Sequence, residues 1–193
     1  MDALVLILIG AAVAAVIMHL RQSKMSFVSQ HPDDYDDAQG PELNLREHLS
    51  GPLICEGVLY GPMGRVTSRF VADMNVTWEG NVGTMTEHFR YDSGATQDRC
   101  WTLTLGNDGS VKATAPDVIG EGQGMAKGHS LQLLYKIQLP ESSGGHVLDA
   151  VDWMYLVENG TIMNRSQFRK FGIKVAELVA TMRKTDDAMR DAA

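Results

Sequence analysis

The sequence predicts an all-β domain of antiparallel strands that follows one membrane-spanning helix. Three observations support this. The chain begins with an uninterrupted apolar run, most of the remainder alternates apolar and polar residues, and short turn signals separate the alternating stretches. Many strands joined by short turns form either a closed barrel or a sandwich. The chain has 193 residues, which is enough for one such domain with a proper core.

The apolar run covers residues 3–20 (ALVLILIGAAVAAVIMHL), and His19 is its single polar residue. As a helix it is just long enough to cross a hydrocarbon core of about 30 Å. A cleavable signal peptide would carry positive charge before the run and a small-residue cleavage site after it. Met1-Asp2 precedes the run and HLRQSKMSF ends it, so neither requirement is met. We therefore expect an uncleaved anchor with its basic flank at 1–24.

The charges beside the run indicate its orientation. Asp2 precedes it, whereas Arg21 and Lys24 follow it. By the positive-inside rule the basic flank stays cytoplasmic, which predicts a cytoplasmic domain. The net charge of −7 argues against a nucleic-acid-binding surface.

A polar linker is expected at 25–44. It contains the acidic stretch HPDDYDDAQGPE, whose Pro, Gly and clustered Asp argue against regular structure. The folded domain is expected at 45–183, and a polar tail at 184–193 completes the chain.

The period of two is clearest from Val66 to Trp78. The stretch from Ile173 to Met182 fits either a closing strand or an amphipathic helix, because its apolar residues also match helical spacing. Further strands are expected at about 53–60, 83–91, 97–105, 110–118, 120–126, 129–139, 147–157 and 161–171.

Two neighbouring strands each carry one charged residue on an otherwise apolar face, Glu87 in 83–91 and Arg99 in 97–105. A loop of three or five residues would place both on one face, whereas a four-residue loop would place Glu87 with Cys100. Burying either charge alone costs several kcal/mol, so a structural ion pair is one interpretation. In the other, Arg99 contacts the acidic head group of a ligand and Glu87 orients it.

Large side chains elsewhere are candidates for the wall of a ligand cavity. Trp101 and Tyr135 lie on apolar strand faces. Around Trp153 either face of the strand can be buried, because both faces carry large residues. Trp153 belongs to one face and the neighbouring Asp152 to the other. Arg165 adds positive charge to the next strand.

Cysteine and histidine patterns predict no metal site and no cofactor. Cys55 and Cys100 lie far apart, no CxxC motif occurs, and the six histidines lack the spacing of metal ligands. The two cysteines would pair only in an oxidising compartment. No Gly-x-Ser-x-Gly elbow occurs, so the sequence carries no catalytic signature.

Short motifs spread over roughly residues 45–183 are specific when taken together. They are Gly51-Pro52-Leu53, Gly64-Arg65-Val66 to Arg69-Phe70, Trp78-x-Gly80, Gly83-Thr84, Glu87-x-Phe89, Arg99-x-Trp101, Asp117-Val118-Ile119-Gly120, Asp152-Trp153-Met154-Tyr155-Leu156, Asn164-Arg165 and Lys170-Phe171-Gly172.

On these motifs the chain resembles an uncharacterised bacterial family of lipocalin-like envelope proteins, the domain of unknown function 3833. The resemblance implies a calycin-type antiparallel barrel whose last strand is 173–182. It also implies work beside enzymes that modify membrane fatty acyl chains, and a periplasmic side of the inner membrane. The chain departs from many members because its anchor is a plain apolar helix without a lipoprotein cysteine.

Three functions follow from these observations. The first, which we take as the prediction, is a single-pass inner-membrane protein that binds or presents a fatty acyl or lipid ligand and is accessory to lipid modification. This function predicts an apolar pocket in the barrel. The second is a scaffold that recruits fatty-acid-modifying enzymes and has no cavity. The third is a lipid-modifying enzyme that uses Glu87 or Asp152, with a raised pKa, as acid or base. The predicted ligand-binding residues are Glu87, Arg99, Trp101, Tyr135, Trp153 and Arg165.

Overall fold

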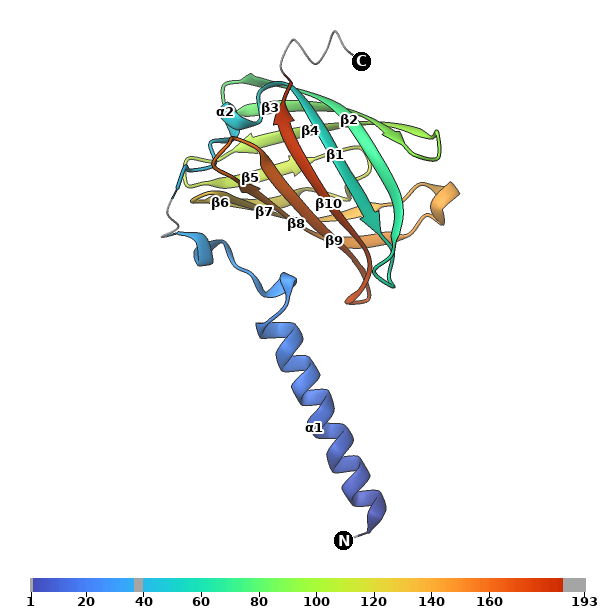
Figure 1. Ribbon diagram of the computed structural model, residues 1–193. Helices are drawn as coiled ribbons and strands as arrows, with labels where there is room; N and C mark the ends of the chain where they lie inside the picture. The colour runs from blue at the N-terminus through green and yellow to red at the C-terminus, as the bar shows by residue number, and fades with distance from the viewer. Residues whose placement is uncertain (1, 37–39, 186–193) are drawn as a thin grey trace.

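Ten antiparallel strands close into a barrel in the computed structural model, which describes residues 2–36 and 40–185 (Figure 1). Each strand pairs with its neighbours in the sequence, and β1 pairs with β10 to complete the ring. The strands are β1 (Gly51–Tyr60), β2 (Val66–Glu79), β3 (Val82–Tyr91), β4 (Thr96–Leu105), β5 (Ser110–Thr114), β6 (Gly122–Lys127), β7 (Ser130–Gln138), β8 (Val147–Leu156), β9 (Ile162–Lys170) and β10 (Ile173–Lys184).

The predicted period of two is confirmed in the walls of the barrel. In β3 the buried positions Met85, Glu87 and Phe89 alternate with exposed residues. The inward side chains of the strands form one hydrophobic core. A barrel rather than a sandwich results because β10, which is a strand and not a helix, pairs with both β9 and β1.

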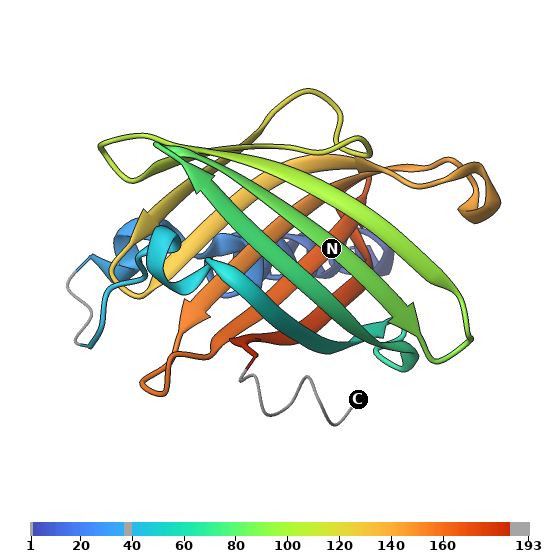
Figure 2. The ribbon, with the colours of Figure 1, turned by 90° about the horizontal axis from the view of Figure 1, so that it is seen from above.

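The N-terminal helix α1 (Ala3–Lys24) lies outside the barrel, and in the view from above it is behind the strands (Figure 2). Its 22 residues correspond to a length of about 33 Å. Among the described residues it is the one helix long and apolar enough to cross a membrane. An anchor and a signal sequence both have these properties.

The short helix α2 (Leu45–His48) covers the end of the barrel at which β1 begins. Leu45 and Leu49 are buried there. The Trp78 indole donates a hydrogen bond to the Leu49 carbonyl, at 2.7 Å. This end of the barrel is therefore closed by packed side chains.

The segment Ser26–Asp36, which we call the strap, lies against the outer face of the barrel. The linker was expected to lack regular structure, but the strap contains two short 3-10 turns, η1 (Phe27–Ser29) and η2 (Pro32–Tyr35). Tyr35 packs edge-on against Trp153 of β8, with ring centroids 5.3 Å apart. Lys127 of β6 forms an ion pair with Asp33, with 2.6 Å between Nζ and Oδ1. A third turn, η3 (Glu141–Ser143), lies between β7 and β8.

Candidate ligand-binding site

The interior of the barrel contains a cavity of about 90 Å³. Its wall is mostly apolar, and the cavity lies among side chains from almost every strand. Methionine contributes strongly, and its unbranched side chain adapts easily to a new neighbour. The methionines are Met74, Met85, Met154 and Met182.

Glu87 and Arg99 face each other across the β3–β4 hairpin, whose loop has one of the two lengths expected to place both on one face. The Tyr91 amide bonds to the Ala95 carbonyl, which leaves three loop residues, and Glu87 is then paired in register with Arg99. The nearest guanidinium and carboxylate atoms are 3.7 Å apart. Arg99 also donates two hydrogen bonds to Asp117, at 2.9 and 3.1 Å. One cation is thus shared by two carboxylates.

The Glu87 carboxyl is buried, with 8% of its surface exposed. Burial raises its pKa to about 7, although the Arg99 charge opposes this shift. Its Oε2 atom is fully enclosed and has no hydrogen-bond partner. An unsatisfied buried acceptor costs about 1–3 kcal/mol, so a ligand that supplies a donor at this point would be favoured.

A second carboxyl, Asp152 of β8, faces the same cavity. It accepts hydrogen bonds from the Ser166 hydroxyl at 2.8 Å and from the Asn164 amide at 2.5 Å. Burial raises the pKa of Asp152 despite these two hydrogen bonds. Burial likewise raises the pKa of Tyr135, and it raises the pKa of the Cys55 thiol to about 12, with Glu87 adding to the effect. The polar part of the site therefore favours uncharged groups.

Outside the wall, an open groove of about 790 Å³ runs along β2, β3 and β4. The groove and the interior cavity share Met74, Glu87 and Arg99 as lining residues. Asp117, which holds Arg99, also borders the groove. The ion cluster therefore lies between the two spaces.

Four of the six predicted site residues meet in the interior. Arg99 lies over the Trp101 ring, with its guanidinium carbon 4.8 Å from the ring centroid. Trp101 contacts Tyr135 edge-on at 5.3 Å. Together with Glu87, all four line the cavity.

The prediction that Trp153 lines the cavity is wrong, and Arg165 is also absent from its lining. Asp152 takes the inward position on β8, so Trp153 points outward and is completely buried beneath the strap. Arg165 of β9 lies on the same outer face, under the Phe27 ring at 4.5 Å. Both faces of this strand pair are covered, which the alternation in the sequence left open.

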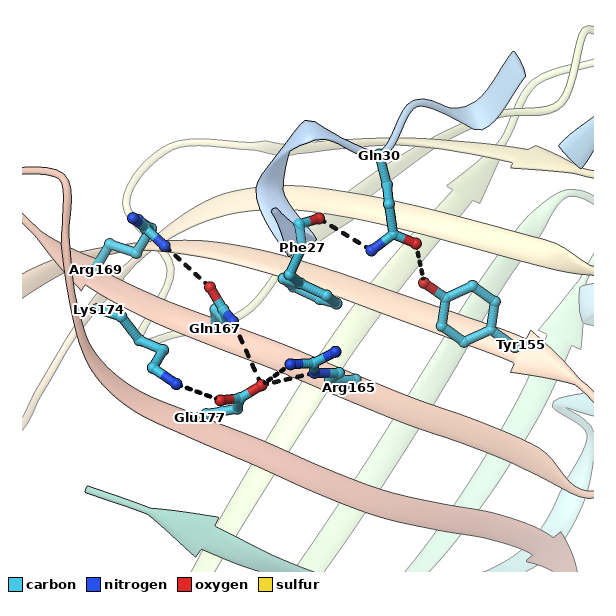
Figure 3. A network of polar contacts seen from close by, with 8 residues as sticks. All are labelled: Phe27, Gln30, Tyr155, Arg165, Gln167, Arg169, Lys174 and Glu177. Carbon is cyan, nitrogen blue, oxygen red and sulfur yellow. Dashed lines mark hydrogen bonds and ion pairs between the residues drawn. The ribbon is translucent and has the colours of Figure 1, made fainter. Parts of the chain in front are cut away.

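Figure 3 shows the polar contacts of this outer face. Glu177 of β10 accepts from Arg165 at 2.5 Å and from Lys174 at 2.5 Å. Burial opposes ionisation of Glu177, but hydrogen bonds from its basic neighbours dominate and lower its pKa. In the strap, Gln30 accepts a hydrogen bond from the Tyr155 hydroxyl at 2.7 Å. The Glu177 ion pairs join β9 to β10, the Gln30 contact holds the strap, and none of these residues lines the cavity.

Three polar residues of the site were not among the predicted ligand-binding residues. Asp117 lies in the connection between β5 and β6, so no strand alternation marks it. Asn164 and Ser166 could have been found, because the period of two puts them on the same face of β9 as the buried Ile162. Cys55 faces the interior and Cys100 the exterior, and both are free thiols.

A family model described as "Protein of unknown function (DUF3833)" matches residues 22–184. No curated protein matches the chain.

Solved structures share the fold at low sequence identity. The S-type phycobiliprotein lyase CPES from Guillardia theta has a TM-score of 0.56 and 9% identity, over 73% of this chain and 90% of its own. A DUF3598 protein of unknown function from Nostoc punctiforme has a TM-score of 0.53 and 11% identity, over 76% and 51%. Rv2717c from M. tuberculosis has a TM-score of 0.51 and 17% identity, over 76% and 99%. The likeness identifies a lipocalin-like barrel.

Proposed function

Since this chain belongs to the DUF3833 family and folds as a lipocalin-like barrel, we propose that it is a membrane-anchored protein that binds an acyl lipid inside the barrel. The observation that carries the proposal is the enclosed Glu87 Oε2 atom, which accepts no hydrogen bond although it borders an apolar cavity and has the Arg99 charge 3.7 Å away. A core without a ligand would gain stability by replacing this carboxyl with an apolar group.

The charges of the site define the polar end of the ligand. Arg99 is already balanced by Glu87 and Asp117, so a ligand anion would meet excess negative charge. Glu87, with its pKa of about 7, can donate a hydrogen bond when protonated and accept one when ionised. An uncharged hydroxyl, ester or amide therefore fits better than the acidic head group first considered. We propose that Arg99 positions Glu87 and does not bind the ligand.

The membrane supplies the ligand in this proposal. Helix α1 anchors the barrel in the bacterial inner membrane as a single span, and acyl chains are the abundant apolar molecules there. The cavity of about 90 Å³ holds only part of such a chain, so its flexible methionines must move on binding. Holding one chain near the bilayer would make the protein accessory to enzymes that modify it.

Photo-crosslinking of the full chain in lipid vesicles tests this proposal. A diazirine-bearing acyl lipid is activated by light, and labelled peptides are identified by mass spectrometry. We expect labels on inward residues of β3, β7 and β8 in addition to α1. Labels confined to α1 would contradict ligand binding and favour the scaffold.

Two tryptophan variants make a matched pair for this experiment. Met154→Trp enlarges a side chain that lines the cavity, whereas Met163→Trp enlarges an exposed one on the neighbouring strand β9. The first should abolish interior labelling and the second should preserve it. Far-ultraviolet circular dichroism establishes that both variants fold.

The raised pKa of Glu87 also favours a second candidate, an enzyme that uses this carboxyl as acid or base on the bound lipid. Incubation of the protein with membrane lipids, followed by mass spectrometry of their acyl chains, tests it. A modified chain that is formed by the wild type and not by Glu87→Gln would establish catalysis.

A further inference from the structure

The turn between β9 and β10 has an unusual residue at its tip. It contains two residues, Phe171 and Gly172, with φ of 52° and 76°, and Lys170 pairs with Ile173 on either side. Two positive φ values in a two-residue loop are typical of a type I′ turn, for which Asn-Gly is preferred. Among the described residues Phe171 is the one non-glycine residue with positive φ. An aromatic residue here strains the backbone.

Packing against the protein does not compensate for the backbone strain at Phe171, because 91% of the surface of this residue is exposed. Ile173 beside it is 69% exposed, and Met63 in the β1–β2 turn is 87% exposed. The two turns are at the same end of the barrel, since β1 ends where its partner β10 begins. We call these three residues the apolar tip.

Basic residues lie beside the apolar tip. Arg65 is two residues after Met63, and Lys170 and Lys174 flank the other turn, although Lys174 is paired with Glu177. Residues 61–65 and 169–174 contain no Asp or Glu, although the chain as a whole has a net charge of −7. Exposed apolar side chains beside basic ones match the interface of an anionic bilayer, where apolar groups enter and basic groups meet phosphates.

The position of α1 brings a bilayer to this end of the barrel. In Figure 1 the turns that carry the apolar tip extend toward the side on which α1 lies. The chain leaves α1 at Lys24 and is fixed to the barrel three residues later, where Phe27 lies over Arg165. From Arg165 to Phe171 along β9 is six residues, or about 20 Å. The tip is therefore within reach of the headgroup layer into which α1 emerges.

We propose that the apolar tip inserts into the headgroup region of the membrane that α1 crosses. The inference rests on the proposed anchoring by α1 and adds a second contact, which fixes the orientation of the barrel. The strained Phe171 is explained by this contact, because its side chain is buried in lipid rather than in protein. The depth expected for such an interfacial side chain is about 5–10 Å.

Depth-dependent quenching of tryptophan fluorescence tests this proposal on the full chain in vesicles that contain anionic lipid. Phe171→Trp places a reporter at the tip, and the signal of the three native tryptophans is subtracted by using the wild type. Bromine is attached to the acyl chains either near the carbonyl or near the methyl end. We expect the tip reporter to lose fluorescence with bromine near the carbonyl, and to lose less with deep bromine.

Two controls separate the tip from the anchor. Ala14→Trp lies within α1 and should be quenched by deep bromine, whereas Val157→Trp lies at the opposite end of the barrel and should not be quenched. If Ala14→Trp is quenched and Phe171→Trp is not, the tip contact is refuted while the anchor stands. If neither is quenched, the anchor fails and the tip contact with it.

A third variant tests whether Phe171 strains the backbone for the sake of a membrane contact. Phe171→Asn suits the backbone conformation and removes the apolar group. We expect it to raise the midpoint of urea unfolding in detergent and to make the barrel of vesicle-bound protein more accessible to protease. A lowered midpoint would contradict the backbone strain attributed to Phe171.

Discussion

Buried polar side chains distinguish the inside of this barrel from a purely apolar core. Glu87, Asp152 and Asn164 are all buried, and each occupies an inward position in an alternating strand. Burying a carboxyl costs free energy unless it is paired or protonated. Glu87 is only partly compensated, because Arg99 is 3.7 Å away and also serves Asp117.

Replacing Glu87 by Gln should change how the stability of the barrel depends on pH. The folded-state pKa of about 7 lies above the ordinary value of 4.5, so the folded state binds this proton more tightly than the unfolded state. The contribution of Glu87 is therefore fully present below pH 4.5 and is lost as the pH rises through 7. We expect Glu87→Gln to gain stability relative to wild type by about 3 kcal/mol over this range.

Urea unfolding of both proteins between pH 4.5 and 8 measures this difference. Glu158→Gln, at an exposed position in the β8–β9 turn, is the control, and its difference from wild type should stay constant. A constant difference for Glu87→Gln would contradict the elevated pKa.

Local sequence signals predict the positions of some residues of the site and not of others. Alternation put Glu87 and Arg99 each on an apolar strand face, but the sequence left open the loop length that sets them opposite each other. Neither signal reveals Asp117, because it reaches Arg99 from a connection outside the regular strands. Alternation also cannot choose a face when both carry large residues, so the outward position of Trp153 was not predictable.

At the scale of elements, β8 is unusual because both of its faces are covered. Its inward face borders the cavity, and the strap lies on its outer face over Trp153 and Tyr155. Tyr35 contacts both aromatic rings, and its hydroxyl donates a hydrogen bond to Gln30 within the strap. Tyr35 is thus the main apolar attachment of the strap.

Removing this ring by Tyr35→Ala should release the strap and leave the barrel folded. We expect a loss of about 2 kcal/mol in the free energy of unfolding, because a half-buried aromatic ring is lost. Trp153 should then gain solvent exposure, which shifts tryptophan emission to longer wavelength, and limited proteolysis should cut within Ser26–Asp36.

Tyr91→Ala, at the end of β3, is the matched control, because its half-buried ring packs against Phe70 and Phe89 and not against the strap. It should leave both the emission and the cleavage pattern unchanged. Unaltered emission from Tyr35→Ala would mean that the strap does not protect Trp153.

The strap was missed because its acidic composition is typical of solvated segments. Its attachment depends on side chains far along the chain, such as the pair of Asp33 with Lys127. By contrast, the strands were predictable because each turn signal ends a local stretch of alternation.

For the whole molecule, the decisive contact is the closure of the ring between β1 and β10. Gly57 on β1 allows the close approach: a Cβ at this position would lie 2.6 Å from the Val179 carbonyl and 2.8 Å from the Phe70 ring. The sequence alone left barrel and sandwich open, because closure joins the first strand to the last and has no local signal.

Gly57→Ala should therefore destabilise the barrel, and most of all at the closure between β1 and β10. Because a backbone carbonyl blocks the added methyl group, we expect a loss of at least about 1–3 kcal/mol in the free energy of unfolding. Amide hydrogen exchange should accelerate first along β1 and β10. Gly10→Ala, in α1 with nothing within 4 Å, should leave barrel exchange unchanged. Uniform acceleration in every strand would contradict a weakness localised at the closure.

The attachment of the strap also determines how this protein meets other molecules. Only Met25 and Ser26 separate α1 from η1, so little free chain lies between the anchor and the body it carries. A domain on a long flexible tether would sweep a hemisphere above the bilayer. If α1 anchors this barrel as proposed, it diffuses at a nearly constant height, and its encounters with other membrane proteins are collisions in two dimensions between surfaces already facing the right way.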